Sequence, residues 1–116
     1  VGDEALGASL SLRLYDYYEE QSRLGRAHPF LTEAAADFSD EPKVAVDLYL
    51  LSLRQAEDFP GEPLHTKMIS LADRLLRLAR TEEAEAFLRD GLAEARRVGD
   101  DDWVEIALQL RKEMNE

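Results

Sequence analysis

The chain has 116 residues, of which 45% are hydrophobic and 34% are charged, a composition typical of one globular domain with a single core. Its 25 acidic and 14 basic residues give a net charge of −11. This charge argues against binding to nucleic acid or anionic lipid, because both attract cationic side chains. It favours a basic or amphipathic protein partner, and solubility alone is an ordinary alternative reason for it.

The sequence contains no cysteine, which excludes disulfides, thiolate zinc sites and cysteine nucleophiles. No apolar run approaches the roughly 20 residues that span a membrane, and no signal-peptide pattern opens the chain. We therefore expect a cytoplasmic protein. The first residue is Val1 rather than methionine, so a leader, a tag or a larger parent chain is compatible with the sequence.

Apolar side chains recur at helical spacing along most of the chain, whereas strand signals are weak because β-branched residues are sparse. About six helices are predicted: residues 3–24, a short helix after Pro29, one from Pro42 to just before Phe59, one from Pro63 to about Arg80, one from Thr81 to Val98, and one that begins at the aspartates 100–102. The expected caps of the third, fifth and sixth helices are Ser39 or Asp40, Thr81, and Asp102. No Gly/Ser-rich linker divides these segments, so we predict a single all-α domain over residues 1–116.

The C-terminal half of the chain contains an internal repeat. Met68, Leu71-Ala72 and Leu75 recur with the same spacing as Trp103, Ile106-Ala107 and Leu110, about one 34-residue period further along, with Ala84, Leu88 and Gly91 between them. This pattern resembles the tetratricopeptide repeat family, in which large residues flank small ones at fixed offsets. Ala45 to Tyr49 is similar to the second helix of an earlier repeat, whereas residues 1–40 show no trace of the pattern. The proline usual near the end of a repeat is missing, and Val98-Gly99-Asp100 stands in its place.

The resemblance implies antiparallel helical hairpins stacked as a short right-handed solenoid of about six helices. Residues 1–40 would be N-terminal helices outside the repeat, and residues 41–116 would form the hairpins. Small residues are then expected where helices nest, namely at Ala72, Gly91 and Ala107, with Trp103 packed on the preceding hairpin. A glycine inside a helix costs about 1 kcal/mol against alanine, and it becomes tolerable where a neighbouring helix leaves no room for a Cβ atom.

Proteins of this family bind peptides or protein segments in a groove lined by the first helix of each hairpin. Here the implied groove residues are Thr66, Ile69, Ser70, Asp73, Leu76 and Arg77, together with Val104 and Leu108 of the last helix. Asp73 and Arg77 also have the spacing of an i,i+4 ion pair. The expected function is therefore that of a protein-interaction module or adaptor, without catalysis, cofactor or metal. An exposed terminal face would also permit a homodimer.

Other interpretations of the sequence remain. A small acidic immunity protein or secretion chaperone that masks a basic cognate protein has the same size and charge. A histidine phosphotransfer bundle centred on His65 is a further alternative, although Lys67 lies one position too early for that motif. Glu62 and His65 have the Glu-x-x-His spacing of helical di-iron sites, but the chain contains no second copy. We therefore expect His65 to lie in a loop or at a helix start.

Two further clusters contain residue types that can form binding sites. Asp100-Asp101-Asp102 lacks the alternating ligands of a calcium loop, so we assign these residues to helix capping. Tyr15, Tyr17 and Tyr18 are a candidate aromatic contact patch on the first helix. No phosphate loop, nucleophile elbow, zinc pattern or catalytic carboxylate pair is present, and we expect no enzymatic activity.

Overall fold

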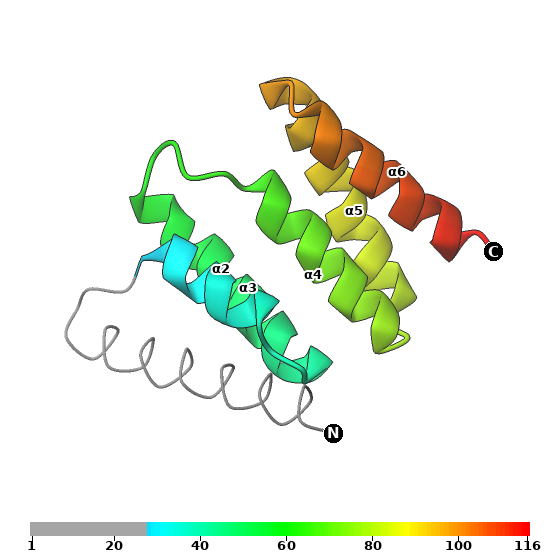
Figure 1. Cartoon of the computed structure of the whole chain (residues 1–116), viewed down its shortest axis with the longest axis horizontal. Helices are drawn as coiled ribbons and strands as arrows, with labels where there is room; N and C mark the ends of the chain where they lie inside the picture. The colour runs from blue at the N-terminus through cyan, green and yellow to red at the C-terminus, as the bar shows by residue number, and fades with distance from the viewer. Residues whose placement is uncertain (1–27) are drawn as a thin grey trace. The chain divides into compact units, whose positions relative to one another are not determined.

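The computed structural model describes residues 28–116, and all regular structure in this part of the chain is helical. The elements in chain order are α2 (Pro29–Asp37), α3 (Pro42–Gln55), the short 3-10 helix η1 (Ala56–Asp58), α4 (His65–Arg77), α5 (Thr81–Val98) and α6 (Asp101–Met114) (Figure 1). The expected all-α class is thus confirmed for the described residues. The first expected helix, at about residues 3–24, lies outside them.

The chain divides into two compact units between Glu62 and Pro63. Within the described residues, unit 1 comprises residues 28–62 and unit 2 comprises residues 63–116. The boundary that we placed at residue 40 falls in the turn between α2 and α3, two helices that pack on each other. The helical structure of unit 1 ends at Asp58, which confirms the predicted stop before Phe59.

The helix pair of unit 1 is held by a small apolar core and by hydrogen bonds from buried polar groups. Ala35 and Ala36 of α2 and Val46 and Tyr49 of α3 are buried. The hydroxyl group of Ser52 donates to the Pro29 carbonyl oxygen at 2.7 Å, so a buried polar side chain of α3 finds its partner at the start of α2. Small side chains on α2 allow the close approach that these contacts need.

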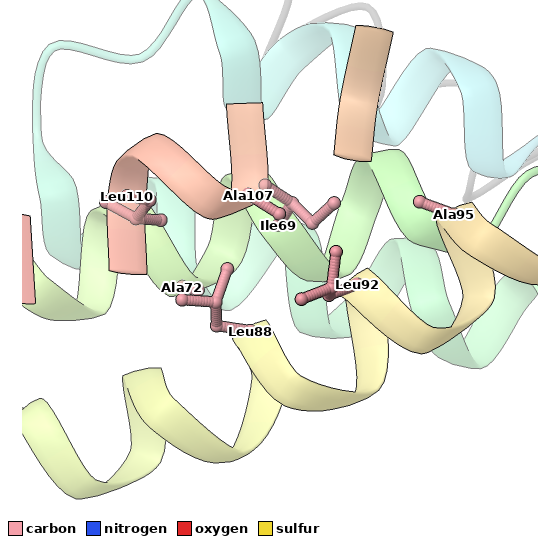
Figure 2. Close-up of a cluster of buried hydrophobic side chains, with 7 residues drawn as sticks. All are labelled: Ile69, Ala72, Leu88, Leu92, Ala95, Ala107 and Leu110. Atoms are coloured by element: carbon pink, nitrogen blue, oxygen red, sulfur yellow. The ribbon is translucent and has the colours of Figure 1, made fainter. Parts of the chain in front are cut away.

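Unit 2 consists of an antiparallel hairpin, α4 and α5, with α6 packed on α5 and also in contact with α4. Its core is a cluster of seven buried side chains contributed by all three helices: Ile69, Ala72, Leu88, Leu92, Ala95, Ala107 and Leu110 (Figure 2). Trp103 is partly buried and packs against this cluster. The predicted position of Trp103 against the preceding hairpin is therefore confirmed.

Gly91 lies where α5 closely approaches α4. A Cβ atom at this position would lie 2.8 Å from Cγ1 of Ile69 and 3.0 Å from Cβ of Met68, closer than two carbon atoms normally approach. Ala72, Gly91 and Ala107 are all buried. The small residues thus occupy helix contacts within unit 2, as the sequence predicts.

All three predicted caps are wrong, and two of these helices have no side-chain cap at all. The residue before α3 is Glu41, which makes no side-chain capping bond, and Ser39 instead bonds to the backbone of Glu41. Thr81 is the first residue of α5, and the position before it is occupied by Arg80 without a side-chain cap. Both helices begin one or two residues away from the expected position, so the predicted hydroxyl or carboxylate is out of reach of the free N–H groups.

The junction between α5 and α6 departs from prediction by a similar shift. Gly99 ends α5 with a φ of 74°, a left-handed conformation that glycine adopts without a Cβ penalty, and this confirms the predicted stop. The cap of α6 is Asp100 rather than Asp102, because the helix begins at Asp101. The Asp100 carboxylate accepts a hydrogen bond from the backbone N–H of Trp103 at 3.4 Å.

Candidate functional site

A groove of about 660 Å³ runs along unit 2 between α4 and α6. The residues that line it from α4 are Ile69, Ser70, Asp73, Arg74 and Arg77, and those from α6 are Asp102, Trp103, Glu105, Ile106, Gln109, Leu110 and Glu113. Ile69 and Leu110 are buried members of the core cluster, so they form the floor. The groove thus joins the first helix of the hairpin to the helix that follows it.

Four of the eight groove residues predicted from the sequence line this groove, and all four come from α4: Ile69, Ser70, Asp73 and Arg77. The other four do not line it. Leu76 and Val104 pack against the core cluster of unit 2, whereas Thr66 is half-buried and Leu108 is exposed elsewhere on the surface. The prediction chose a face of α6 that is rotated away from the groove, since each residue along a helix turns the side chain by about 100°.

None of the seven α6 residues that line the groove was predicted from the sequence to do so. The missed residues follow two helical stripes, an apolar one through Trp103, Ile106 and Leu110 and a polar one through Asp102, Glu105, Gln109 and Glu113. Both stripes repeat at three- and four-residue intervals, so they were visible as spacings in the sequence. What the spacings did not reveal is which side of α6 faces α4.

The charges of the two walls differ. On α4, the Asp73 carboxylate accepts hydrogen bonds from Arg74 and from Arg77, the latter at 3.4 Å, and this confirms the predicted pair between Asp73 and Arg77. On α6, the carboxylates of Asp102, Glu105 and Glu113 form no ion pair within the described part of the chain. The α4 wall thus carries one carboxylate and two guanidinium groups, a net charge of +1, whereas the α6 wall carries three carboxylates. The groove as a whole is acidic, with a net charge of −2.

His65 connects the starts of α4 and α6 at one end of unit 2. It is the first residue of α4, as expected for a helix-start histidine, and only 5% of it is exposed. Its Nε2 atom lies 2.8 Å from a carboxylate oxygen of Asp100, and its ring meets the Trp103 ring edge-on with centroids 6.2 Å apart. Because Asp100 also accepts from the Trp103 backbone, His65 and Asp100 together hold the first turn of α6, from which Trp103 reaches the groove.

The surroundings of His65 bear on the phosphotransfer alternative. Its Nδ1 atom is buried and has no hydrogen-bond partner among residues 28–116, while Nε2 is occupied by Asp100. Neither ring nitrogen is open to a phosphoryl donor in this arrangement. In the same residues no group of three or more histidines, aspartates and glutamates is placed to hold a metal ion.

The hydrogen bond from His65 lowers the pKa of the Asp100 carboxyl below its ordinary value of 3.8, with a smaller contribution from the Trp103 N–H. A carboxyl with a lower pKa in the folded state stabilises the fold above the unfolded pKa, and this contribution is lost as pH falls through the folded value. We therefore predict that Asp100→Asn reduces the loss of stability between about pH 5 and about pH 2. The measurement is the urea midpoint of each protein across this range.

Arginine partners also lower the pKa values of Glu83 and Glu94, so acid weakens both the wild type and the variant. The difference between the two stability curves isolates the contribution of Asp100, and two parallel curves would contradict the prediction.

The aromatic patch predicted at Tyr15, Tyr17 and Tyr18 lies outside the described residues. None of the helices between residues 28 and 116 combines the length and the apolar character needed to cross a membrane.

Comparison of the chain with protein-family models, with curated proteins and with solved structures gives no match. The function must therefore be argued from the groove itself, and the resemblance to tetratricopeptide repeats rests on the residues quoted above.

Proposed function

We propose that this protein is a non-catalytic interaction module and that the groove between α4 and α6 receives a segment of a partner protein. The observation that carries the proposal is the presence of exposed apolar surface inside a concave, charged groove. Ile106 is 48% exposed and lines the groove beside the partly buried Trp103. Large apolar side chains in a concavity with a polar rim are typical of protein-binding surfaces.

Burial of these two side chains supplies a driving force for association. Covering the exposed half of an isoleucine contributes about 1 kcal/mol, and a tryptophan at the centre of an interface often contributes more than its neighbours. The carboxylates of Asp102, Glu105 and Glu113 add long-range attraction for a basic segment. The groove thus suits a partner that is both apolar and basic.

On this proposal α4 and α5 correspond to one tetratricopeptide-like hairpin, and α6 corresponds to the first helix of the next. The burial of Ala72, Gly91 and Ala107 at helix contacts supports this assignment, and the full solenoid remains part of the proposal. A dedicated inhibitor or secretion chaperone would use the same acidic surface to mask a single basic protein. Selection of short peptides separates the two roles, because a general module binds isolated segments.

The experiment selects tryptophan-free peptides from a random display library against the full chain. Affinity is then measured from the fluorescence of Trp103, the single tryptophan of the sequence. We predict that Ile106→Arg weakens the selected peptides by about tenfold or more, since loss of a buried apolar contact and insertion of a charge together exceed about 1.4 kcal/mol.

Leu108→Arg is the matched control. Leu108 lies on the same helix and is 39% exposed, but it does not line the groove, so its replacement should leave affinity within about twofold. If both variants bind the selected peptides as tightly as the wild type, or if both lose them equally, the groove is not the binding surface.

A further inference from the structure

The polar residues of the α6 wall, three carboxylates and one amide, form a regular ladder. Asp102, Glu105, Gln109 and Glu113 are all exposed and all line the groove. Their spacing of three, four and four residues places them along one side of the helix over about three turns. The only basic residues of α6, Arg111 and Lys112, do not line the groove. Charge is therefore segregated on this helix, with its negative side toward the groove.

The opposite wall compensates this ladder only in part. Arg74 and Arg77 of α4 line the groove, but both bond to Asp73. One carboxylate balances only one of the two arginines, so the α4 wall keeps a net charge of +1 against the three carboxylates of α6. The groove therefore retains a net charge of −2. A partner therefore needs cationic side chains along one line, next to apolar side chains that cover Trp103 and Ile106.

We propose that the occupant is an amphipathic helix of a partner protein, with lysine or arginine repeated every three or four positions beside an apolar stripe. This inference rests on the proposed function and specifies the chemistry of its partner. Both walls are α-helices whose backbone groups are bonded within the helix, so they offer no edge with which an extended segment could pair. A helical occupant satisfies its own backbone and needs only side-chain contacts.

The register of the ladder also fits a helix. With a rise of about 1.5 Å per residue, Glu105 and Glu113 lie about 4.5 Å and about 16.5 Å beyond Asp102 along the α6 axis. A partner helix aligned with α6 repeats its side chains with the same rise, so lysines at equivalent intervals meet all three carboxylates. Side chains on one face of an extended segment recur every 6.6 Å or so, which misses both carboxylates by roughly 2–3 Å.

The test uses the full chain and three synthetic, tryptophan-free peptides of about 16 residues. The first carries leucines on one helical stripe and lysines on the next at the spacing of the ladder. The second has the same composition in scrambled order, and the third is the first with a central proline that breaks the helix. We expect the first to bind with a shift of Trp103 fluorescence and with an affinity that falls as salt rises, and the other two to bind at least about tenfold more weakly.

Two charge-matched variants locate the ladder. The groove variant is Asp102→Asn, Glu105→Gln and Glu113→Gln combined. The control variant is Asp101→Asn, Glu82→Gln and Glu116→Gln combined, three exposed residues that do not line the groove. Both variants remove three negative charges. We expect the groove variant to weaken the first peptide by about tenfold and to flatten its salt dependence, and the control to change the affinity by less than about twofold.

The outcomes separate this inference from the proposed function. Equal binding of all three peptides, or equal effects of the two variants, overturns the basic helix, while continued loss of binding in Ile106→Arg keeps the groove as the site. Absence of binding by the first peptide, when library peptides still require Ile106, likewise overturns the helix alone. Binding that is indifferent both to Ile106→Arg and to the groove variant overturns both proposals.

Discussion

Replacement of Gly91 by leucine is expected to destabilise unit 2 by about 1–3 kcal/mol through overpacking. A Cβ atom at this position would lie 2.8 Å from the Ile69 side chain and 3.3 Å from the Ile69 backbone nitrogen. The side chain can change its rotamer, but the backbone of α4 can yield only if the two helices separate. Separation would disrupt the core cluster, which includes Ile69 and Leu92. The effect should therefore appear in the stability of the whole unit.

Urea denaturation followed by Trp103 fluorescence provides the measurement, because Trp103 packs against the same cluster. Ala93→Leu is the control, since Ala93 is an exposed residue of the same helix and leucine has nearly the same helix propensity as alanine. Gly91→Ala is informative as an intermediate step. It gains up to about 1 kcal/mol of helix propensity and introduces the close contact with Ile69. A Gly91→Leu protein as stable as the wild type would mean that α4 and α5 do not approach closely at this glycine.

The close helix contacts of unit 2 could be predicted because they depend on residue size at regular spacing. Ala72 and Ala107 occupy corresponding places in the internal repeat, and both are buried in the cluster. A small residue between large ones marks a position where a neighbouring backbone leaves no room, and this property is local to the sequence. Asp73 and Arg77 belong to the same category, because an i,i+4 pair is determined within a single helix.

The α6 side of the groove could not be predicted in the same way. The rotation of α6 about its own axis is set by the packing of Ala107 and Leu110 against the other two helices. A shift of one residue along α6 therefore replaces a position that lines the groove with one that packs in the core or faces away. Val104 was assigned to the groove and Ile106 was not, yet Ile106 lines it. Hydrophobicity alone does not distinguish these positions, because both carry β-branched apolar side chains.

The contact between His65 and Asp100 could not be predicted from any local sequence pattern. The two residues are 35 positions apart, so no local pattern connects them, and the run of three aspartates obscured which one bonds to a partner. The structure selects Asp100 because α6 begins directly after it and turns its carboxylate toward the start of α4. A capping residue that also reaches across to a second helix is determined by the fold rather than by helix propensity.

Leu92→Ala is expected to have the largest effect of the single replacements, about 2–5 kcal/mol of lost stability. Leu92 is only 2% exposed, and it lies in the cluster together with side chains from α4 and α6 (Figure 2). Truncation removes its contacts with both helices and leaves a cavity between them. Since domains of this size are stable by about 5–15 kcal/mol, the loss is a large fraction of the total.

Leu108→Ala serves as the matched control, because it removes the same atoms from a leucine that is 39% exposed and should cost less than about 1 kcal/mol. Both variants are compared by urea denaturation with Trp103 fluorescence. If the two replacements reduce stability equally, Leu92 is not a core residue and the arrangement of α4, α5 and α6 is wrong.

A larger loss of stability for Leu92→Ala means that the core beneath the groove floor fixes α6 against α4. The binding surface then depends on the same three-helix packing that stabilises the unit, so variants of the groove should be judged only after their stability is matched to the wild type.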